Sequence, residues 1–195
     1  PLRLVATAGA DGVFVSQDGG SLWAPVPDEP EGNWRGVVFS AEGELFAANL
    51  GSGVLLSTDG GGTWSQGVQS GLQEVPVLYV LVDPSDSRRL FAATGGLGLL
   101  RSEDRGATWS TVLDEALFFL TAAIDPTDPQ RIYAGSTTDG VFVSEDGGDT
   151  WRPFNDGLFN RTVTALAVDP VDPEIIYAGT EGGGVFRRRI TSPGS

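Results

Sequence analysis

The chain has 195 residues and a net charge of −14 at pH 7, from 26 acidic side chains and 12 basic ones. This acidity argues against sequence-independent nucleic-acid binding, which depends on neutralising phosphates, and against binding to anionic membrane surfaces. The chain has no histidine and no cysteine, so it lacks Ser-His-Asp and Cys-His chemistry and the usual zinc ligands. No apolar run is long enough for a membrane helix, and we expect no membrane insertion, no cofactor and no metal.

One eight-residue phrase, Ser-x-Asp-x-Gly-x-Thr-Trp, organises the chain and is called the box here. It begins at residues 16, 57, 102 and 144, a spacing that marks a repeat architecture. Aspartate accepts backbone N–H groups across a turn, glycine adopts positive φ, and tryptophan anchors the turn, so we expect the boxes to be structural rather than catalytic. The residues involved are Ser16, Asp18, Gly20 and Trp23, then Ser57, Asp59, Gly61 and Trp64, then Ser102, Asp104, Gly106 and Trp109, and finally Ser144, Asp146, Gly148 and Trp151.

Short runs rich in Val, Ile, Phe and Tyr flank each box and predict β-strands. In chain order, the expected strands are 2–6, 12–15 and 23–26; 34–39, 44–48, 53–56 and 64–68; 77–82, 89–93, 97–101 and 109–113; 119–124, 131–135, 140–144 and 150–154; and 163–168, 175–179 and 184–188. Each full unit has four strands, labelled A to D from the centre outward. The first unit lacks strand A, and the last lacks both strand D and a box.

The box, together with Asp-Pro linkers at 83–86, 125–129 and 169–173, resembles the Asp-box or BNR repeat. This repeat occurs in sialidase-like, xyloglucanase-type, photosystem-assembly and sortilin-type propellers. The resemblance implies an all-β chain, a β-propeller of about five four-stranded repeats with incomplete first and last blades. It predicts a single domain over 1–190, with units near 1–32, 33–73, 74–116, 117–160 and 161–190, and a flexible tail over 191–195. The units form either a five-bladed ring or a segment of a larger ring.

In such propellers, ligands usually meet the face formed by the D-to-A and B-to-C loops. The candidate ligand-binding residues there are Trp34, Arg35, Phe118, Asp139, Phe159 and Arg161. Aromatic and arginine side chains suit the recognition of a peptide or glycan, although the filling of gaps between blades is the role that core energetics favours for these aromatic residues. A glycosidase would need two facing carboxylates, for which Asp11, Asp139 and Glu181 are the candidates if the ring closes. Each of these also suits a simple turn-capping role.

The pattern therefore favours a non-catalytic binding or scaffold module that recognises a protein or carbohydrate. One alternative is a carbohydrate-active enzyme, or part of one. Another is an excised or engineered propeller segment that self-assembles, as a homo-oligomer whose copies complete the terminal blades. We expect an extracytoplasmic location, either periplasmic or secreted from a bacterium.

Overall fold

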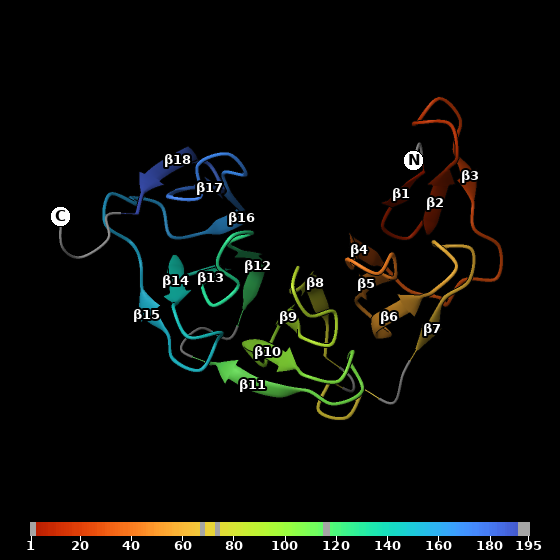
Figure 1. Cartoon of the computed structure of the whole chain (residues 1–195), viewed down its shortest axis with the longest axis horizontal. Helices are drawn as coiled ribbons and strands as arrows, with labels where there is room; N and C mark the ends of the chain where they lie inside the picture. The colour runs from red at the N-terminus through yellow and green to blue at the C-terminus, as the bar shows by residue number, and fades with distance from the viewer. Residues whose placement is uncertain (1–2, 67–68, 73–74, 115–117, 191–195) are drawn as a thin grey trace.

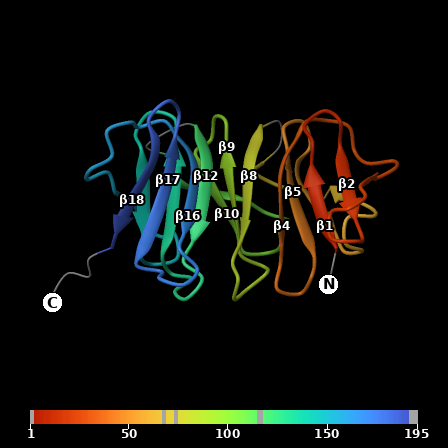
Figure 2. The same ribbon diagram turned by 90° about the horizontal axis from the view of Figure 1, so that it is seen from above.

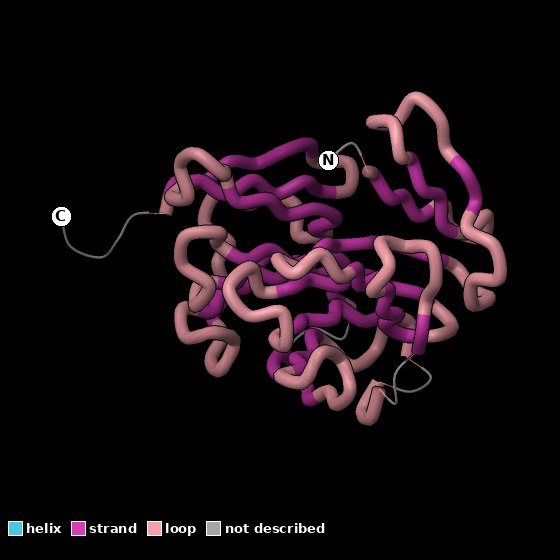
Figure 3. The backbone as a smooth tube through the Cα atoms, turned by 45° about the vertical axis from the view of Figure 1, so that its right-hand side comes forward, coloured by secondary structure: helices cyan, strands magenta, loops and turns pink. Residues whose placement is uncertain are grey.

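In the computed structural model, residues 3–66, 69–72, 75–114 and 118–190 are described, and this part of the chain contains strands and loops without helices (Figure 3). The predicted tail over 191–195 lies outside the described residues. Five antiparallel sheets follow one another along an arc (Figure 1). Sheet 1 contains β1 (Leu4–Thr7), β2 (Val13–Ser16) and β3 (Ala24–Pro25); sheet 2 contains β4 (Trp34–Phe39), β5 (Leu45–Asn49), β6 (Gly53–Ser57) and β7 (Ser65–Gln66); sheet 3 contains β8 (Val77–Val82), β9 (Leu90–Thr94), β10 (Leu99–Ser102) and β11 (Ser110–Leu113); sheet 4 contains β12 (Phe119–Ile124), β13 (Ile132–Ser136), β14 (Val141–Ser144) and β15 (Arg152–Pro153); and sheet 5 contains β16 (Val163–Val168), β17 (Ile175–Thr180) and β18 (Gly184–Arg189).

Each sheet is a meander in which neighbouring strands are consecutive in the chain. The inner strands β4, β8, β12 and β16 lie side by side (Figure 2), and contacts join β4 to β8, β8 to β12, and β12 to β16. Among the described residues, the first sheet has no strand A and the last has no strand D, as predicted. About five four-stranded repeats with incomplete terminal units are therefore confirmed.

The core lies in the four seams between neighbouring sheets, because alternate residues of each strand point to opposite faces. In β5, Ala47 packs towards sheet 1, whereas Phe46 packs towards sheet 3. The same alternation holds in sheet 4, where Ala134 faces sheet 3 and Tyr133 faces sheet 5. Each middle sheet is consequently apolar on both faces, which explains the continuous apolar runs in the sequence.

The terminal sheets each have one uncovered face. In sheet 5, Val185 is 74 % exposed, although its counterpart in sheet 4, Val141, is only 3 % exposed. In sheet 1, Leu4 is 43 % exposed, whereas its counterpart Leu45 is fully buried. Sheets 1 and 5 stand at the two ends of the arc (Figure 1), so the described chain forms an open arc.

The boxes form the turns between strands C and D, as expected. In the fourth box, Ser144 Oγ donates to Asp146 Oδ1 and accepts from the Gly148 N–H, both at 2.8 Å. The Thr150 hydroxyl and N–H both donate to Asp146. These two bonds, with that from Ser144, lower the pKa of Asp146 to about 2, and the other three box aspartates also have lowered pKa values. The carboxylates are therefore held as anions within the turn.

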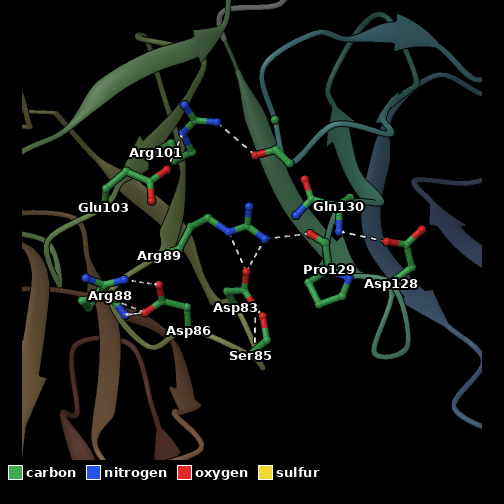
Figure 4. A network of polar contacts seen from close by, with 12 residues as sticks. Asp83, Ser85, Asp86, Arg88, Arg89, Arg101, Glu103, Asp128, Pro129 and Gln130 are labelled. Carbon is green, nitrogen blue, oxygen red and sulfur yellow. Dashed lines mark hydrogen bonds and ion pairs between the residues drawn. The ribbon is translucent and has the colours of Figure 1, made fainter.

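Polar contacts join the sheets near the boxes. In the seam between sheets 3 and 4 (Figure 4), Arg89 bonds Asp83 and donates from Nη2 to the Pro129 carbonyl at 2.8 Å. In the seam between sheets 2 and 3, Arg105 pairs with Glu44 at 3.1 Å and with Glu42 at 3.2 Å. These two seams thus have polar contacts as well as an apolar core.

Candidate functional site

The loops at the A-strand start of sheets 3 to 5 are joined into one surface. The Gly95 and Phe118 backbones form a bridge, and the Thr137 N–H donates to the Phe118 carbonyl at 3.1 Å. The Glu181 N–H donates to the Thr162 carbonyl at 3.0 Å. Together with the bond from the Thr162 hydroxyl to the Thr137 carbonyl, these bonds connect three B-to-C loops through two D-to-A loops. We call this surface the loop platform, and it comprises Gly95, Phe118, Thr137, Asp139, Phe159, Asn160, Arg161, Thr162 and Glu181.

Polar side chains of the platform bond to main-chain oxygens. The Thr162 hydroxyl donates to the Thr137 carbonyl at 2.9 Å, and Asn160 Nδ2 donates to the Glu181 carbonyl at 2.6 Å. The Arg161 guanidinium reaches the Asp139 carbonyl at 3.4 Å, leaving most of its donors directed elsewhere. These bonds fix the relative positions of the loops, so the platform is a preorganised surface.

Two aromatic rings protrude from the platform. Phe159 is 91 % exposed, and its ring centroid lies 6.4 Å from that of Phe186 in β18. Phe118 is 49 % exposed, with one edge of its ring close to Gly95. A large apolar side chain that is exposed to water on a fixed loop is a feature of recognition surfaces.

The structure brings together four of the six predicted ligand-binding residues: Phe118, Asp139, Phe159 and Arg161. Arg35 is exposed on β4 in sheet 2, two sheets away from β12. The prediction for Trp34 is wrong, because its side chain is only 2 % exposed and packs edge-on against Trp64 with ring centroids 5.2 Å apart. A bulge between Trp34 and Gly36 turns the first side chain of β4 into the seam.

The candidate carboxylates do not form a cluster. Asp11 belongs to sheet 1, whereas Asp139 and Glu181 belong to sheets 4 and 5 at the other end of the arc (Figure 1). The convergence expected for a closed ring is therefore not formed. Asp139 Oδ2 accepts the Thr138 hydroxyl at 2.5 Å, and the Asp139 N–H donates to Ser136 Oγ at 2.9 Å, so the acceptor for the backbone of this turn is Ser136. Within the described residues, no group of three or more acidic side chains is arranged to hold a metal ion.

Comparisons with known proteins agree with this geometry. A family model described as the BNR/Asp-box repeat matches residues 55–66, which contain the second box. The GH74 xyloglucanase from Xanthomonas campestris superposes with a TM-score of 0.78 and 20 % identity, over 97 % of this chain and 35 % of that one. YCF48 bound to D1 peptide superposes with a TM-score of 0.71 and 19 % identity, over 98 % of this chain and 62 % of that one.

The chain is a β-propeller built from Asp-box repeats. A third similar structure, the outer coat vertex of COPII on membranes, has a TM-score of 0.76 and 10 % identity, over 97 % of this chain and 55 % of that chain. The propeller described here thus spans about a quarter to a third of the GH74 chains and less than two thirds of the YCF48 chain in the peptide complex. No curated protein matches the sequence. Within the described residues of the propeller, no helix is long and apolar enough to cross a membrane.

Sequence reasoning missed one repeated feature of the propeller. A polar side chain after strand D accepts the N–H of a residue near the start of strand C in the same sheet. Glu29 accepts from Val13 at 2.8 Å, Gln69 from Val54 at 2.7 Å and Asn155 from Val141 at 2.8 Å. Burial raises the pKa of Glu29, and the Val13 bond opposes that shift. The three residue types differ and their spacing from the box varies, so the motif is visible only in the hydrogen bonds.

Proposed function

We propose that this propeller is a non-catalytic binding or scaffold module whose loop platform recognises a protein or glycan ligand. The observation that supports it is the 91 % exposure of Phe159 on a loop fixed by its neighbours. Asn160 and Thr162, one and three residues further on, bond to main-chain oxygens of the adjacent B-to-C loops. Exposing a phenylalanine on a rigid loop has no structural benefit, whereas burying it against a ligand contributes binding energy without an ordering cost.

The platform offers complementary groups around this ring. A flat phenyl face suits the C–H face of a sugar or an apolar side chain of a peptide. The free guanidinium donors of Arg161 suit carbonyl, hydroxyl and carboxylate oxygens. The similar solved structures include a xyloglucanase and a protein bound to a peptide, and these two ligand classes are the ones we propose for the platform.

Titration calorimetry with xyloglucan oligosaccharides, and selection from a displayed peptide library, test the proposal. We expect Phe159→Ala and Arg161→Ala to weaken binding of the selected ligand at least about 10-fold, which corresponds to about 1.4 kcal/mol. Phe39→Ala is the matched control, because Phe39 is about half exposed at the opposite end of strand A. Binding that both platform variants leave unchanged would contradict the proposal.

A carbohydrate-active enzyme is the second candidate function, favoured by the structural similarity to GH74 enzymes. An assay for hydrolysis on the same protein and xyloglucan samples distinguishes this function from binding without catalysis. Release of new reducing ends from xyloglucan would replace the non-catalytic proposal with this one. The separate positions of Asp11, Asp139 and Glu181 lead us to expect no release, since glycoside hydrolysis needs two carboxylates facing one bond.

A further inference from the structure

The outer edge of β18 differs from the outer edge of every earlier C strand. The strands β2, β6, β10 and β14 each pair on that side with a D strand, namely β3, β7, β11 and β15. In the described part of the chain, β18 pairs only with β17. Its N–H and C=O groups along the other edge are therefore available to an incoming strand.

The complete sheets show what an added strand contributes. In sheet 4, Arg152 lies opposite Val143 and Pro153 lies opposite Phe142. The next residue, Phe154, donates its N–H to the Val141 carbonyl at 2.7 Å and is buried. In sheet 1, Val26 makes the same bond to Val13 at 2.9 Å and is also buried. An added strand thus supplies three residues in a fixed register.

The register transfers directly to sheet 5. Val141 and Val143 pair with Gly135 and Tyr133 of β13, and Val185 and Arg187 pair with the corresponding Gly179 and Tyr177 of β17. An added strand in the same register would therefore place its three residues opposite Arg187, Phe186 and Val185. Val185 is largely exposed because it lies on the uncovered face of sheet 5, whereas its counterpart Val141 packs in the seam between sheets 4 and 5.

An apolar cavity lies beside Phe186. It has a volume of about 110 Å³ in the seam between sheets 4 and 5, and its apolar lining includes Phe154, Leu158, Leu166, Ile176 and Phe186. The Arg188 guanidinium covers one side, 3.9 Å from the Phe154 ring centroid and paired with Asp156 at 3.0 Å. The corresponding position beside Phe142 is covered by Pro153. The cavity has room for one aliphatic side chain.

The positive charge of Arg187 favours an acidic residue at the opposite position of the added strand. Arg188 and Arg189 already pair with acidic side chains, whereas Arg187 is exposed and has no partner among the described residues. The same strand position in sheet 3 is Arg101, which bonds Asp149 Oδ1 at 2.7 Å and the Gly147 carbonyl at 3.0 Å. Arg101 thus reaches the box of the next sheet, and its own D-strand neighbour is Ser110. The acidic residue opposite Arg187 is instead inferred from the favourable pairing of opposite charges across neighbouring strands.

We propose that the free edge of β18 binds an extended segment of a partner protein as a fourth strand. The segment has an acidic residue opposite Arg187, then an aliphatic residue beside the Phe186 cavity, then an apolar residue over Val185. A second copy of β18 does not fit this description, because pairing two such edges would bring two arginine triplets together. This surface adjoins the loop platform, because the Phe159 ring centroid lies 6.4 Å from that of Phe186, but its defining contacts are the backbone of β18 and the side chain of Arg187.

A fluorescein-labelled peptide, Gly-Ser-Trp-Glu-Val-Phe-Gly-Ser, tests the proposal by fluorescence anisotropy with the whole chain. We expect saturable binding, and a loss of about 10-fold or more for Arg187→Glu, which corresponds to about 1.4 kcal/mol. A peptide with arginine in place of glutamate should show the reverse preference, binding the variant better than the wild type. Arg35→Glu is the matched control, since Arg35 is an exposed strand arginine in sheet 2.

Backbone pairing is tested with a second peptide, methylated on the phenylalanine nitrogen. The register of sheet 4 assigns that N–H to the Val185 carbonyl, so methylation should abolish binding. Equal binding of the methylated peptide would overturn the strand-addition geometry. Two results would overturn the proposal itself. One is that the unmodified peptide shows no saturable binding up to about 1 mM, and the other is that wild type and Arg187→Glu bind the glutamate and arginine peptides with equal affinity.

Discussion

Two glycines in equivalent turns provide a direct test of how the sheets stack. Gly20 in the first box and Gly148 in the fourth both have φ of +94°. Alanine at either site must adopt a left-handed conformation, which costs about 1–2 kcal/mol. The sites differ in what a Cβ atom would contact. At Gly148 it would lie 2.9 Å from the Phe91 ring of the preceding sheet, whereas at Gly20 its nearest contact would be Leu4 Cδ1 of its own sheet at 3.4 Å.

The expected free energies of unfolding follow from this difference. Forcing a methyl group against a buried ring adds an overpacking cost of about 1–3 kcal/mol. Gly148→Ala should therefore destabilise the protein by about 2–5 kcal/mol, and Gly20→Ala by about 1–2 kcal/mol. The excess arises because sheet 3 covers the fourth box, whereas no sheet precedes the first box in the described chain.

Urea denaturation followed by tryptophan fluorescence measures both variants. The variant Phe91→Leu and the double variant Gly148→Ala/Phe91→Leu complete a double-mutant cycle. Removing the ring should recover part of the stability that Gly148→Ala loses, which gives an interaction energy between the two sites of about 0.5–3 kcal/mol. Equal destabilisation by the two glycine variants, or a coupling near zero, would refute the stacking of the fourth box on sheet 3.

Three further predictions concern single side chains. As the pH drops from the ordinary aspartate pKa of 3.8 towards about 2, the free energy of unfolding should fall, because in this range the unfolded chain binds protons that the box carboxylates of the folded chain do not. Urea midpoints measured across this range test the prediction, and Asp146→Asn should reduce the pH dependence of the midpoint. Asn155→Ala leaves the buried Val141 N–H unpaired, so we expect a loss of about 1–3 kcal/mol and faster hydrogen exchange at that amide. Arg105→Gly relieves a positive φ of 61°, but it removes the exposed pair with Glu42 and leaves the Glu44 carboxylate, whose side chain is only 15 % exposed, without its cation. We expect a net loss of about 1–2 kcal/mol and a smaller salt dependence of the urea midpoint.

The repeated features of the fold could be predicted from the sequence because each turn depends on local chemistry. The Ser-Asp-Gly pattern satisfies its own hydrogen bonds within a few residues, so the turn is encoded wherever the box occurs. The missing strands at the two ends followed from aligning the repeats on their boxes. The open arc could not be predicted in this way, because ring closure depends on the angle between packed sheets, and no local sequence pattern specifies that angle.

The candidate site was predictable only in part. Phe118, Asp139, Phe159 and Arg161 lie on loops whose position follows from the strand order. Trp34 was wrongly predicted to bind ligand, because an aromatic residue at the border between a loop and a strand can lie either on the surface or in the seam between two sheets. Alignment with Val77, Phe119 and Val163, which begin the other A strands and are all buried, would have identified it as a seam residue. The acceptor residues after strand D carry no common sequence signal.

The polar seam contacts have a consequence for the order of the repeats. The residue just before strand B touches the box of the following sheet: Arg3 lies against Gly60, Glu44 pairs with Arg105, and Arg89 lies against Gly147. The seam between sheets 2 and 3 therefore has the opposite charge arrangement from its neighbours. Replacing sheet 2 with a duplicate of sheet 3 would place an arginine against Arg105. Although the blades share a repeated sequence pattern, they are not interchangeable, because the charges at each boundary match only one of the possible neighbouring sheets.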